Sequence, residues 1–401
     1  MPKNIVILCD GTSNQIEEQR SNILRLYGCL RRNDEQIVFY DPGVGTFGGE
    51  DDWLRWTRQA KEVWGLATGW GLDRNVREAY RFLVEHFDPG DPGKGIPQDT
   101  IFIFGFSRGA YTARVLAGFI HALGIIDRTQ LNLASYAYRA YKQIGRKERP
   151  AGGLGSDNSA FTDMRLHERA LKTFRPKIKA LGLFDTVASV IEHGPVFPQL
   201  RTLPFTTTNP SVEHVRHAVA IDERRTMFNP LLWPAGGEYW GSPFRPGDAK
   251  VKPQDVKEVW FSGVHGDVGG GYGEKNSAQA KIPLAWMIDE MEAPELGLKF
   301  IPQTVRRVVL GEDPKHPEYV RPGVYQDLNR SMTAAWRAVE ALPRRIPATS
   351  FRERGRKGCY FPLCDRRLIP PGAIIHASVH ERMDSDKNYR PVNLPRPGRS
   401  D

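Results

Sequence analysis

Cysteine is scarce in this chain of 401 residues, and its four cysteines are Cys9, Cys29, Cys359 and Cys364. So few cysteines exclude a disulfide-stapled scaffold. Cys359 and Cys364 are too widely spaced for a C-x-x-C motif, and none occurs elsewhere in the sequence. We therefore expect no structural zinc site.

Long hydrophobic runs are also absent. No apolar stretch reaches the roughly 18 to 20 residues that a membrane-spanning helix needs. The stretch Ile5–Cys9 is too short for the core of a signal peptide, and no small-residue cleavage site follows it. We expect the chain to be made in the cytoplasm, and export without a signal peptide stays open.

The composition is that of an ordinary globular protein, with 40% hydrophobic and 26% charged residues and a net charge of +9. It excludes collagen-like, disordered and coiled-coil proteins. The positive charge is uneven, because 14 basic and only 7 acidic residues lie between Ser331 and Asp401. Such a region attracts anionic partners. An anionic membrane surface is one candidate, a merely soluble surface is the alternative, and we expect no nucleic acid.

Short apolar runs that end in polar residues alternate with helical patterns. This alternation predicts an α/β protein with a doubly wound, mainly parallel sheet, whose ligands bind at the carboxyl ends of the strands. The predicted strands are Ile5–Cys9, Gln36–Tyr40, Thr100–Phe104, Lys177–Phe184 and Val256–Gly263, and the predicted helices are Ser21–Leu30, Arg74–Phe87 and Ala110–Leu123.

The domain organisation follows from where this pattern weakens. We expect a catalytic core over residues 1–292 and a basic C-terminal region over 293–401 packed on it. Within the core, the polar, Gly- and Pro-punctuated segments at about 128–173 and 192–249 are expected to be insertions over the sheet edge that form a lid or cap.

Gly105-Phe106-Ser107-Arg108-Gly109 is a G-x-S-x-G motif between the strongest predicted strand and a helix of small residues. That context is where a nucleophile elbow belongs, since the turn is too tight for side chains at the glycine positions. The motif predicts Ser107 as a nucleophile, with its hydroxyl exposed above the sheet.

A serine nucleophile needs a base, and the base needs a carboxylate that fixes its tautomer. Asp185 closes one predicted strand and His265 follows another, so that Ser107, Asp185 and His265 keep the chain order of α/β-hydrolases. Other candidates stay open: His217, His376 or His380 for the base, and Asp222 or Asp267 for the acid. For His217 we favour a packing or pocket-lining role.

The segment Asp10-Gly11-Thr12 follows the first predicted strand, where the hydrolase fold places one side of its oxyanion hole. Backbone amides of Gly11 or Thr12, together with that of Arg108, would supply the donors. Asp10 is expected to orient this loop. The segment from Gly266 to Tyr272 is rich in glycine but lacks the Lys-Ser/Thr of a P-loop, and Asp267 within it would cap a helix or bind a cation.

Four motifs at the predicted strand ends belong together: Asp10-Gly11-Thr12-x-Asn14, Gly105-Phe106-Ser107-Arg108-Gly109-Ala110, Gly182-Leu183-Phe184-Asp185-Thr186-Val187 and Gly263-Val264-His265-x-Asp267-Val268-Gly269-Gly270-Gly271-Tyr272. The segment His217 to Arg225 with Phe228, and the tail from Ile375 to Leu394, add to them. Together they resemble an uncharacterised α/β-hydrolase domain family that includes phospholipase effectors of bacterial type VI secretion. The resemblance implies a lipase or esterase whose triad is Ser107, Asp185 and His265.

We therefore expect an enzyme that cleaves a carboxylic ester, foremost that of a lipid or phospholipid, through an acyl-enzyme intermediate and without a cofactor or metal. Two alternatives stay open. One is a metal- or Asp-dependent phosphohydrolase that uses Asp10, Asp185 and Asp267, and the other is a non-catalytic membrane-docking module on the same fold. The sequence does not indicate the oligomeric state.

Overall fold

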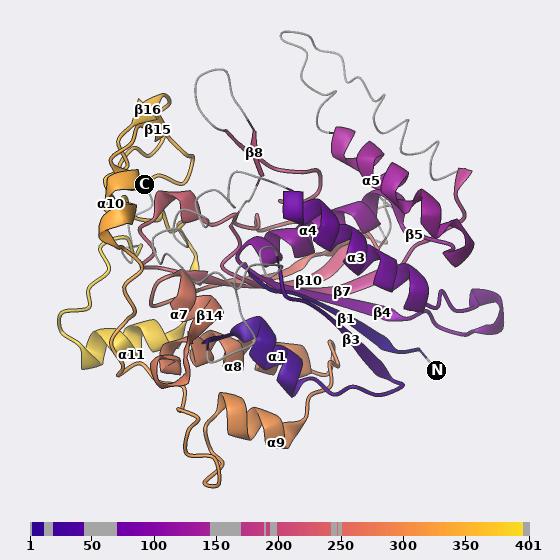
Figure 1. Cartoon of the computed structure of the whole chain (residues 1–401), viewed down its shortest axis with the longest axis horizontal. Coiled ribbons are helices and arrows are strands. Elements are labelled where there is room, and N and C mark those ends of the chain that lie inside the picture. The colour runs from indigo at the N-terminus through magenta and orange to yellow at the C-terminus, as the bar shows by residue number, and fades with distance from the viewer. Residues whose placement is uncertain are drawn as a thin grey trace, which may run out of the picture.

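The computed structural model (Figure 1) describes residues 2–11, 19–43, 70–144, 170–187, 190–192, 199–241, 247 and 251–395. Within these residues a sheet of seven parallel strands forms the centre, in the order β17-β13-β10-β7-β4-β1-β3. The α/β class and the parallel sheet predicted from the sequence are confirmed. The strands are β1 (Asn4–Cys9), β3 (Gln36–Asp41), β4 (Thr100–Phe106), β7 (Lys177–Phe184), β10 (Val212–Ala220), β13 (Asp255–Phe261) and β17 (Ile374–Ile375).

Helices cover both faces of this sheet, as in a doubly wound fold. Because side chains alternate along a strand, β1 sends Ile5 and Ile7 into one hydrophobic cluster and Val6 and Leu8 into another. The first cluster is closed by α3 (Trp70–His86), α4 (Arg108–Leu123) and α5 (Ala134–Gln143), and the second by α1 (Asn22–Cys29) and α8 (Ala278–Glu292).

The direction of winding changes between β1 and β4. β1 lies between β3 and β4, and the chain then continues outward through β7, β10, β13 and β17. Ligands of open α/β sheets bind outside the carboxyl ends of the strands at such a switch point. The turn after β4 and the loop after β1 both begin at this switch point.

The segment 192–249 differs from the expected insertion, because it contains the central strand β10. The sequence does not indicate this strand clearly, because polar residues interrupt its apolar pattern. Arg216 and His217 are nevertheless buried, and both have ionic partners. Arg216 contacts Asp255 at 2.6 Å and Glu290 at 2.5 Å, and His217 contacts Glu258 at 2.9 Å. Buried charges are tolerated where they are paired in this way.

Part of the first expected insertion also belongs to the core. In α5, Tyr138 and Tyr141 pack their rings against Phe119 of α4. Residues 145–169, 193–198, 242–246 and 248–249 of the two expected insertions lie outside the described part of the chain, and the expected lid or cap is a prediction there.

The C-terminal region completes the central sheet. β17 pairs with β13, and beneath it Trp260 packs with Ile369 and Val379 in a third hydrophobic cluster. None of the described helices is long and apolar enough to cross a bilayer. The remaining helical elements are η1 (Pro92–Lys94), η2 (Arg128–Leu133), η3 (Thr226–Phe228), α7 (His265–Gly269), η5 (Glu274–Asn276), α9 (Pro302–Thr304), η6 (Val305–Val309), α10 (Ala334–Glu340) and α11 (Ala377–Ser385).

The remaining described strands are short and form two-stranded pairs. The pairs are β2 (Gln19–Ser21) with β14 (Gly270–Gly273), β5 (Ile125–Ile126) with β6 (Thr173–Phe174), β8 (Val190–Glu192) with β9 (Gln199–Arg201), β11 (Glu238–Tyr239) with β12 (Lys252–Pro253), and β15 (Arg344–Arg345) with β16 (Cys359–Tyr360).

Candidate active site

Ser107 lies in the tight turn between β4 and α4, with φ 57° and ψ −121°. Such a conformation is strained for a residue with a Cβ, and strained residues concentrate at functional sites. The backbone amide of Ser107 donates to the carbonyl of Phe184 at 3.0 Å, and the amide of Val187 donates to the carbonyl of Ser107 at 3.3 Å. These bonds attach the turn to the end of β7.

The two glycines of the motif allow this turn to pack. A Cβ at Gly105 would collide with the backbone of Gly109 and Ala110. A Cβ at Gly109 would collide with the carbonyl oxygens of Cys9 and Asp10. The first turn of α4 therefore lies directly against the end of β1.

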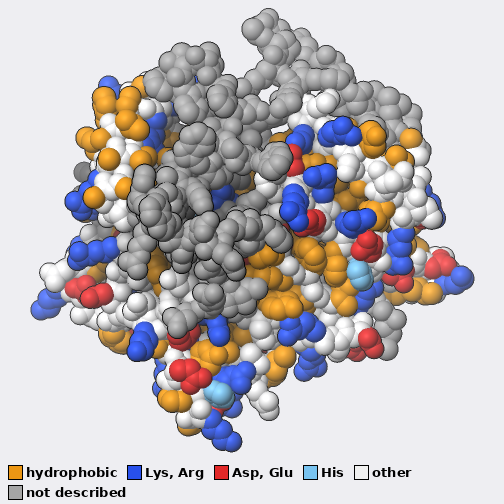
Figure 2. Space-filling model, in the orientation of Figure 1, with side chains coloured by type: hydrophobic (Ala, Val, Ile, Leu, Met, Phe, Trp, Pro, Cys, Tyr) orange, Lys and Arg blue, Asp and Glu red, His pale blue; other side chains and the backbone are white. Residues whose placement is uncertain are grey.

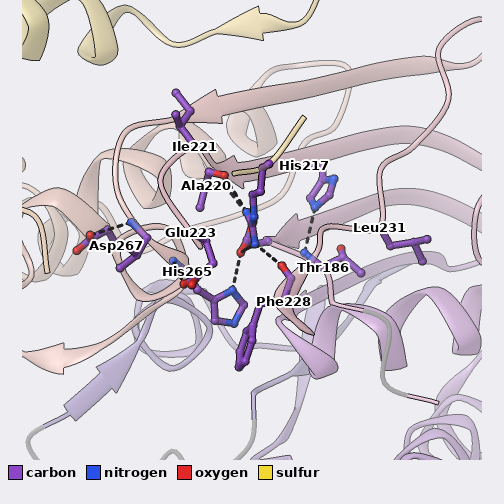
Figure 3. Close-up of polar contacts among 12 residues, drawn as sticks. Thr186, His217, Ala220, Ile221, Glu223, Phe228, Leu231, His265 and Asp267 are labelled. Carbon is purple, nitrogen blue, oxygen red and sulfur yellow. Dashed lines mark hydrogen bonds and ion pairs between the residues drawn. The ribbon is translucent and has the colours of Figure 1, made fainter. Parts of the chain in front are cut away.

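Asp185 and His265 form a buried pair, of which Figure 3 labels His265. Nδ1 of His265 lies 2.5 Å from Oδ2 of Asp185. Asp185 directly follows β7 and has φ 41°, so this residue is held in a strained conformation too. His265 opens α7, just after β13.

Two aromatic rings hold the imidazole of His265. The ring of Phe106 lies 4.7 Å away between centroids and that of Phe228 lies 5.1 Å away, edge-on. Phe106 is the neighbour of Ser107 in the chain. Through this contact and the bond between Ser107 and Phe184, the structure brings Ser107, Asp185 and His265 to one place at the carboxyl edge of the sheet.

A second charged partner of Asp185 was not foreseen from the sequence. Arg367 contacts Oδ1 of Asp185 at 2.6 Å and Oδ2 at 2.9 Å. Complete burial alone would raise the pKa of the Asp185 carboxyl, but Arg367 and His265 outweigh it and hold that pKa well below its usual range. The carboxylate is thus fixed in its ionised form.

Glu223 is a further buried group that sequence reasoning missed. Its Oε2 accepts from the backbone amide of His265 at 3.2 Å and pairs with Arg225 at 2.9 Å. Burial would raise the pKa of Glu223, but Arg225 lowers it to about 2. Glu223 therefore anchors the backbone of His265 as an anion.

The loop after β1 is held by Asp10. Its carboxylate accepts hydrogen bonds from the hydroxyls of Ser21 at 2.5 Å and Tyr40 at 2.7 Å, and from the amide of Gly11 at 2.6 Å. The Gly11 amide, expected to face an oxyanion, therefore donates to Asp10 in this structure. Thr12 lies outside the described residues, and Arg108 opens α4 beside Ser107.

The other histidines considered for the base have different surroundings. His217 is fully buried on β10, where its Nε2 accepts from the amide of Thr186 at 3.2 Å (Figure 3). Burial lowers the pKa of His217, although Glu258 opposes this. His376 caps α11 and stacks on Phe261, and His380 is exposed on α11.

The alternative acids also have partners of their own. Asp267 accepts from the amide of Val264 at 3.0 Å and from the side chain of Asn329 at 2.6 Å, and burial raises its pKa to about 6. Asp222 accepts from the amide of Gly263 and the hydroxyl of Tyr389, both at 2.7 Å. Both residues stabilise the loops that carry His265.

The phosphohydrolase alternative needs Asp10, Asp185 and Asp267 in one group. Each of the three has its own set of partners, and the described part of the chain holds no group of three or more His, Cys, Asp or Glu side chains that could hold a metal ion.

The sequence around Arg367 gives almost no sign of its burial. Asp365, Arg367 and Ile369 are buried, whereas Arg366 and Leu368 are less so. The sequence shows this alternation of buried and less buried residues only in the spacing of Arg367 and Ile369. Nothing in the sequence separates Arg367 from the many arginines around it.

Comparison with known proteins gives three kinds of match. The family model described as "T6SS, Phospholipase effector Tle1-like, catalytic domain" matches residues 3–290. The uncharacterized protein YEL023C of Saccharomyces cerevisiae is 35% identical over 242 residues, which are 58% of this chain and 33% of the yeast protein. This chain thus spans about a third of the length of that curated relative.

Two solved structures are similar at lower identity. An uncharacterized protein from Pseudomonas aeruginosa is 18% identical with a TM-score of 0.37, over 79% of this chain and 48% of that one. The Tle1 effector bound to the VgrG spike of the Type 6 secretion system is 19% identical with a TM-score of 0.33, over 69% of this chain and 52% of that one.

Proposed function

Since the chain belongs to the family of Tle1-like phospholipase effector catalytic domains, we propose that it is a serine hydrolase that cleaves the acyl ester of a lipid. Ser107 is the nucleophile, His265 the base and Asp185 the acid. The observation that carries the proposal is the strained Ser107 turn beside the buried pair of His265 and Asp185, at the point where the winding of the sheet changes.

The contacts of His265 assign its tautomer. An ionised Asp185 only accepts hydrogen bonds, so Nδ1 of His265 carries the proton and Nε2 keeps its lone pair. Nε2 then takes the hydroxyl proton of Ser107 while Oγ attacks the ester carbonyl. The proton passes on to the departing alcohol, and water activated by the same nitrogen cleaves the acyl-enzyme.

The developing oxyanion needs amide donors near Ser107. The amide of Arg108 at the start of α4 is one, and the positive end of the helix adds to it. The loop of Asp10, Gly11 and Thr12 supplies the second, and for Gly11 to serve, its hydrogen bond to Asp10 has to open when substrate binds.

A fluorophosphonate probe tests the mechanism, because it reacts only with an activated serine. The wild type should be labelled on Ser107, located by peptide mass spectrometry, and Ser107→Ala should carry no adduct while its thermal unfolding stays the same. Ser107→Ala should also lose hydrolysis of phospholipid vesicles and of p-nitrophenyl butyrate. Hydrolysis that persists in Ser107→Ala, or that stops in the wild type on adding a chelator, would contradict the triad.

The proposal includes an anionic membrane surface as partner. We define the basic lobe as residues 342–366, which contain β15 and β16. It exposes Leu342, Phe361 and Leu363 beside five exposed cations, and Figure 2 shows hydrophobic and basic side chains together over this part of the molecule. The exposed cations are Arg345, Arg352, Arg354, Arg356 and Lys357.

Vesicle sedimentation tests the basic lobe. Binding to phosphatidylglycerol vesicles should exceed binding to phosphatidylcholine vesicles and should weaken with salt. Changing Arg354, Arg356 and Lys357 together to Gln should reduce it, whereas Arg306→Gln, an exposed arginine elsewhere, should not. Equal binding of both lipids, or tighter binding of duplex DNA than of vesicles, would contradict this part of the proposal.

A further inference from the structure

Arg367 reaches the candidate triad from outside the segment that the family model matches, which ends at residue 290. It lies between β16 and β17, and only 1% of its surface is exposed. A guanidinium buried to this degree has lost its hydration, so its contacts must replace it.

The contacts of Arg367 converge on the acid and its surroundings. Its two terminal nitrogens donate to the two oxygens of Asp185, at 2.6 and 2.9 Å. They also donate to the carbonyl of Ala220 at 2.8 Å and to that of Phe228 at 2.5 Å. Phe228 is the residue whose ring packs edge-on against His265.

The carboxylate of Asp185 is thereby saturated. Oδ1 accepts from Arg367 and from the amide of Ala220 at 3.0 Å, and Oδ2 accepts from Arg367 and His265. A carboxylate offers about four acceptor sites. Rotation of the Asp185 carboxylate about its Cβ–Cγ bond would therefore break several of these hydrogen bonds at once. The oxygen that faces Nδ1 of His265 is fixed by Arg367.

We propose that Arg367 is a positioning residue of the reaction, which fixes Asp185 against His265 and sets how strongly that pair holds a proton. This inference rests on the function proposed above and assigns part of the active site to a residue beyond the matched segment. The rest of the chain holds Arg367 in place, because Asn393 donates to its carbonyl at 3.1 Å and Ile369 anchors the next turn of chain among Trp260 and Val379.

The electrostatic consequence has a definite sign. An isolated carboxylate would stabilise the imidazolium form of His265, whereas the guanidinium beside it offsets that charge. Removing the guanidinium of Arg367 should therefore favour protonation of the His265 imidazole. As the pH falls, the neutral imidazole should then be lost at a higher pH than in the wild type. The other charged or titratable groups around the pair stay unchanged in the test: Glu223 and Arg225 after β10, Asp222 at Gly263, Asp267 on α7, His217 and Glu258 on β10 and β13, and Arg108 and Arg114 on α4.

Three variants separate positioning from a merely structural role. Arg367→Met removes the charge at similar length, Arg367→Lys keeps the charge but not the two-pronged contact, and Arg306→Met is an exposed control with the same change. For each variant, kcat and kcat/KM are measured against pH with p-nitrophenyl butyrate. The imidazole of His265 is also titrated by NMR in histidine-labelled protein, which needs no activity.

In Arg367→Met the acid limb of the rate profile and the NMR midpoint of His265 should both rise by about one pH unit or more. Arg367→Lys should keep the midpoint of the wild type but lose at least about tenfold in kcat, since one ammonium group cannot bridge both oxygens as the guanidinium does. Arg306→Met should match the wild type in every readout.

An unshifted midpoint in folded Arg367→Met would overturn the proposal, and so would full kcat in Arg367→Lys. If Arg367→Met does not fold, the kcat of Arg367→Lys decides alone. Failure of the proposed function looks different: the wild type would then carry no fluorophosphonate adduct on Ser107. A wild type labelled on Ser107, with Arg367 variants that keep its rates and midpoint, would refute only the role of Arg367.

Discussion

The carboxylate of Asp185 is shared between the imidazole of His265 and the buried guanidinium of Arg367. Replacing it with the neutral amide should lower kcat by about 10⁴, the loss seen when a triad acid no longer fixes the tautomer of its histidine. Here the change also leaves Arg367 as an unpaired buried charge, and breaking a buried pair costs about 3–5 kcal/mol of stability. We expect Asp185→Asn to be both inactive and unstable in urea.

A double variant distinguishes these two losses. Asp185→Asn combined with Arg367→Met removes both charges, so it should regain much of the stability lost in Asp185→Asn but none of the activity. If the double variant is as unstable as the single one, the ion pair is not what stabilises this part of the molecule.

His121 gives the molecule a specific acid sensitivity. It is buried on α4, with Nδ1 2.7 Å from Oγ of Ser211, and burial together with Arg175 lowers its pKa to about 4. The unfolded chain takes up this proton near pH 6.5 and the folded one only near pH 4. Stability from this residue is thus present above pH 6.5 and is lost as the pH falls toward 4.

Urea unfolding at pH 7 and pH 5 measures this effect. Between these values the wild type should lose about 2 kcal/mol more stability than His121→Gln, which cannot take up the proton. The same pH dependence in both proteins would show that His121 does not titrate as its surroundings require.

At the scale of elements, the contact between α4 and β1 depends on Gly109. A methyl group there would meet the carbonyls of Cys9 and Asp10, so Gly109→Ala should push the elbow away from the loop after β1 and destabilise the protein by about 1–3 kcal/mol. Gly28→Ala is the matched control, because nothing lies within 4 Å of its added Cβ and it lies in α1. It should stabilise the protein by up to about 1 kcal/mol. In thermal unfolding, the Tm of Gly109→Ala should fall below that of the wild type and the Tm of Gly28→Ala should rise above it.

The sequence predicted the elements whose apolar pattern agrees with their burial. β1 and β4 are almost wholly apolar, β7 is apolar from Ala180 to Phe184, and each was foreseen within two residues of its bounds. β10 was not, because Glu213, His214, Arg216 and His217 interrupt its apolar pattern. Glu213 pairs with Lys179 of β7, and the partners of the other three are Asp255 and Glu258 of β13 and Glu290 of α8. No local pattern in the sequence reveals such long-range pairing.

The candidate site was predictable to the extent that strand ends and motifs define it. Ser107, Asp185 and His265 each follow a strand whose position the sequence indicated, and parallel strands bring their ends together. Arg367 and Glu223 could not be found in this way. Their roles arise from tertiary contacts between segments far apart in the chain, and an arginine in a basic region resembles its solvent-exposed neighbours.

At the scale of the whole molecule, the region beyond residue 292 is joined to the core at several points. It adds β17 to the central sheet, covers Trp260 and supplies Arg367 to Asp185. A chain ended at residue 292, the boundary expected from the sequence, would expose that cluster and leave the acid without its cation. We expect it to aggregate, or to unfold in urea well before the full chain, and to show no Ser107 labelling. A soluble truncated chain that is labelled on Ser107 would contradict this.

The late position of Arg367 in the sequence has a consequence for when the candidate site is completed during synthesis. A ribosome synthesises Ser107, Asp185 and His265, in that order, before it reaches Arg367. Until then the carboxylate of Asp185 lacks its contacts with Arg367. On the function proposed above, we expect a growing or prematurely released chain to react more weakly with lipid than the full chain, and full reactivity to be reached only after translation has passed Arg367.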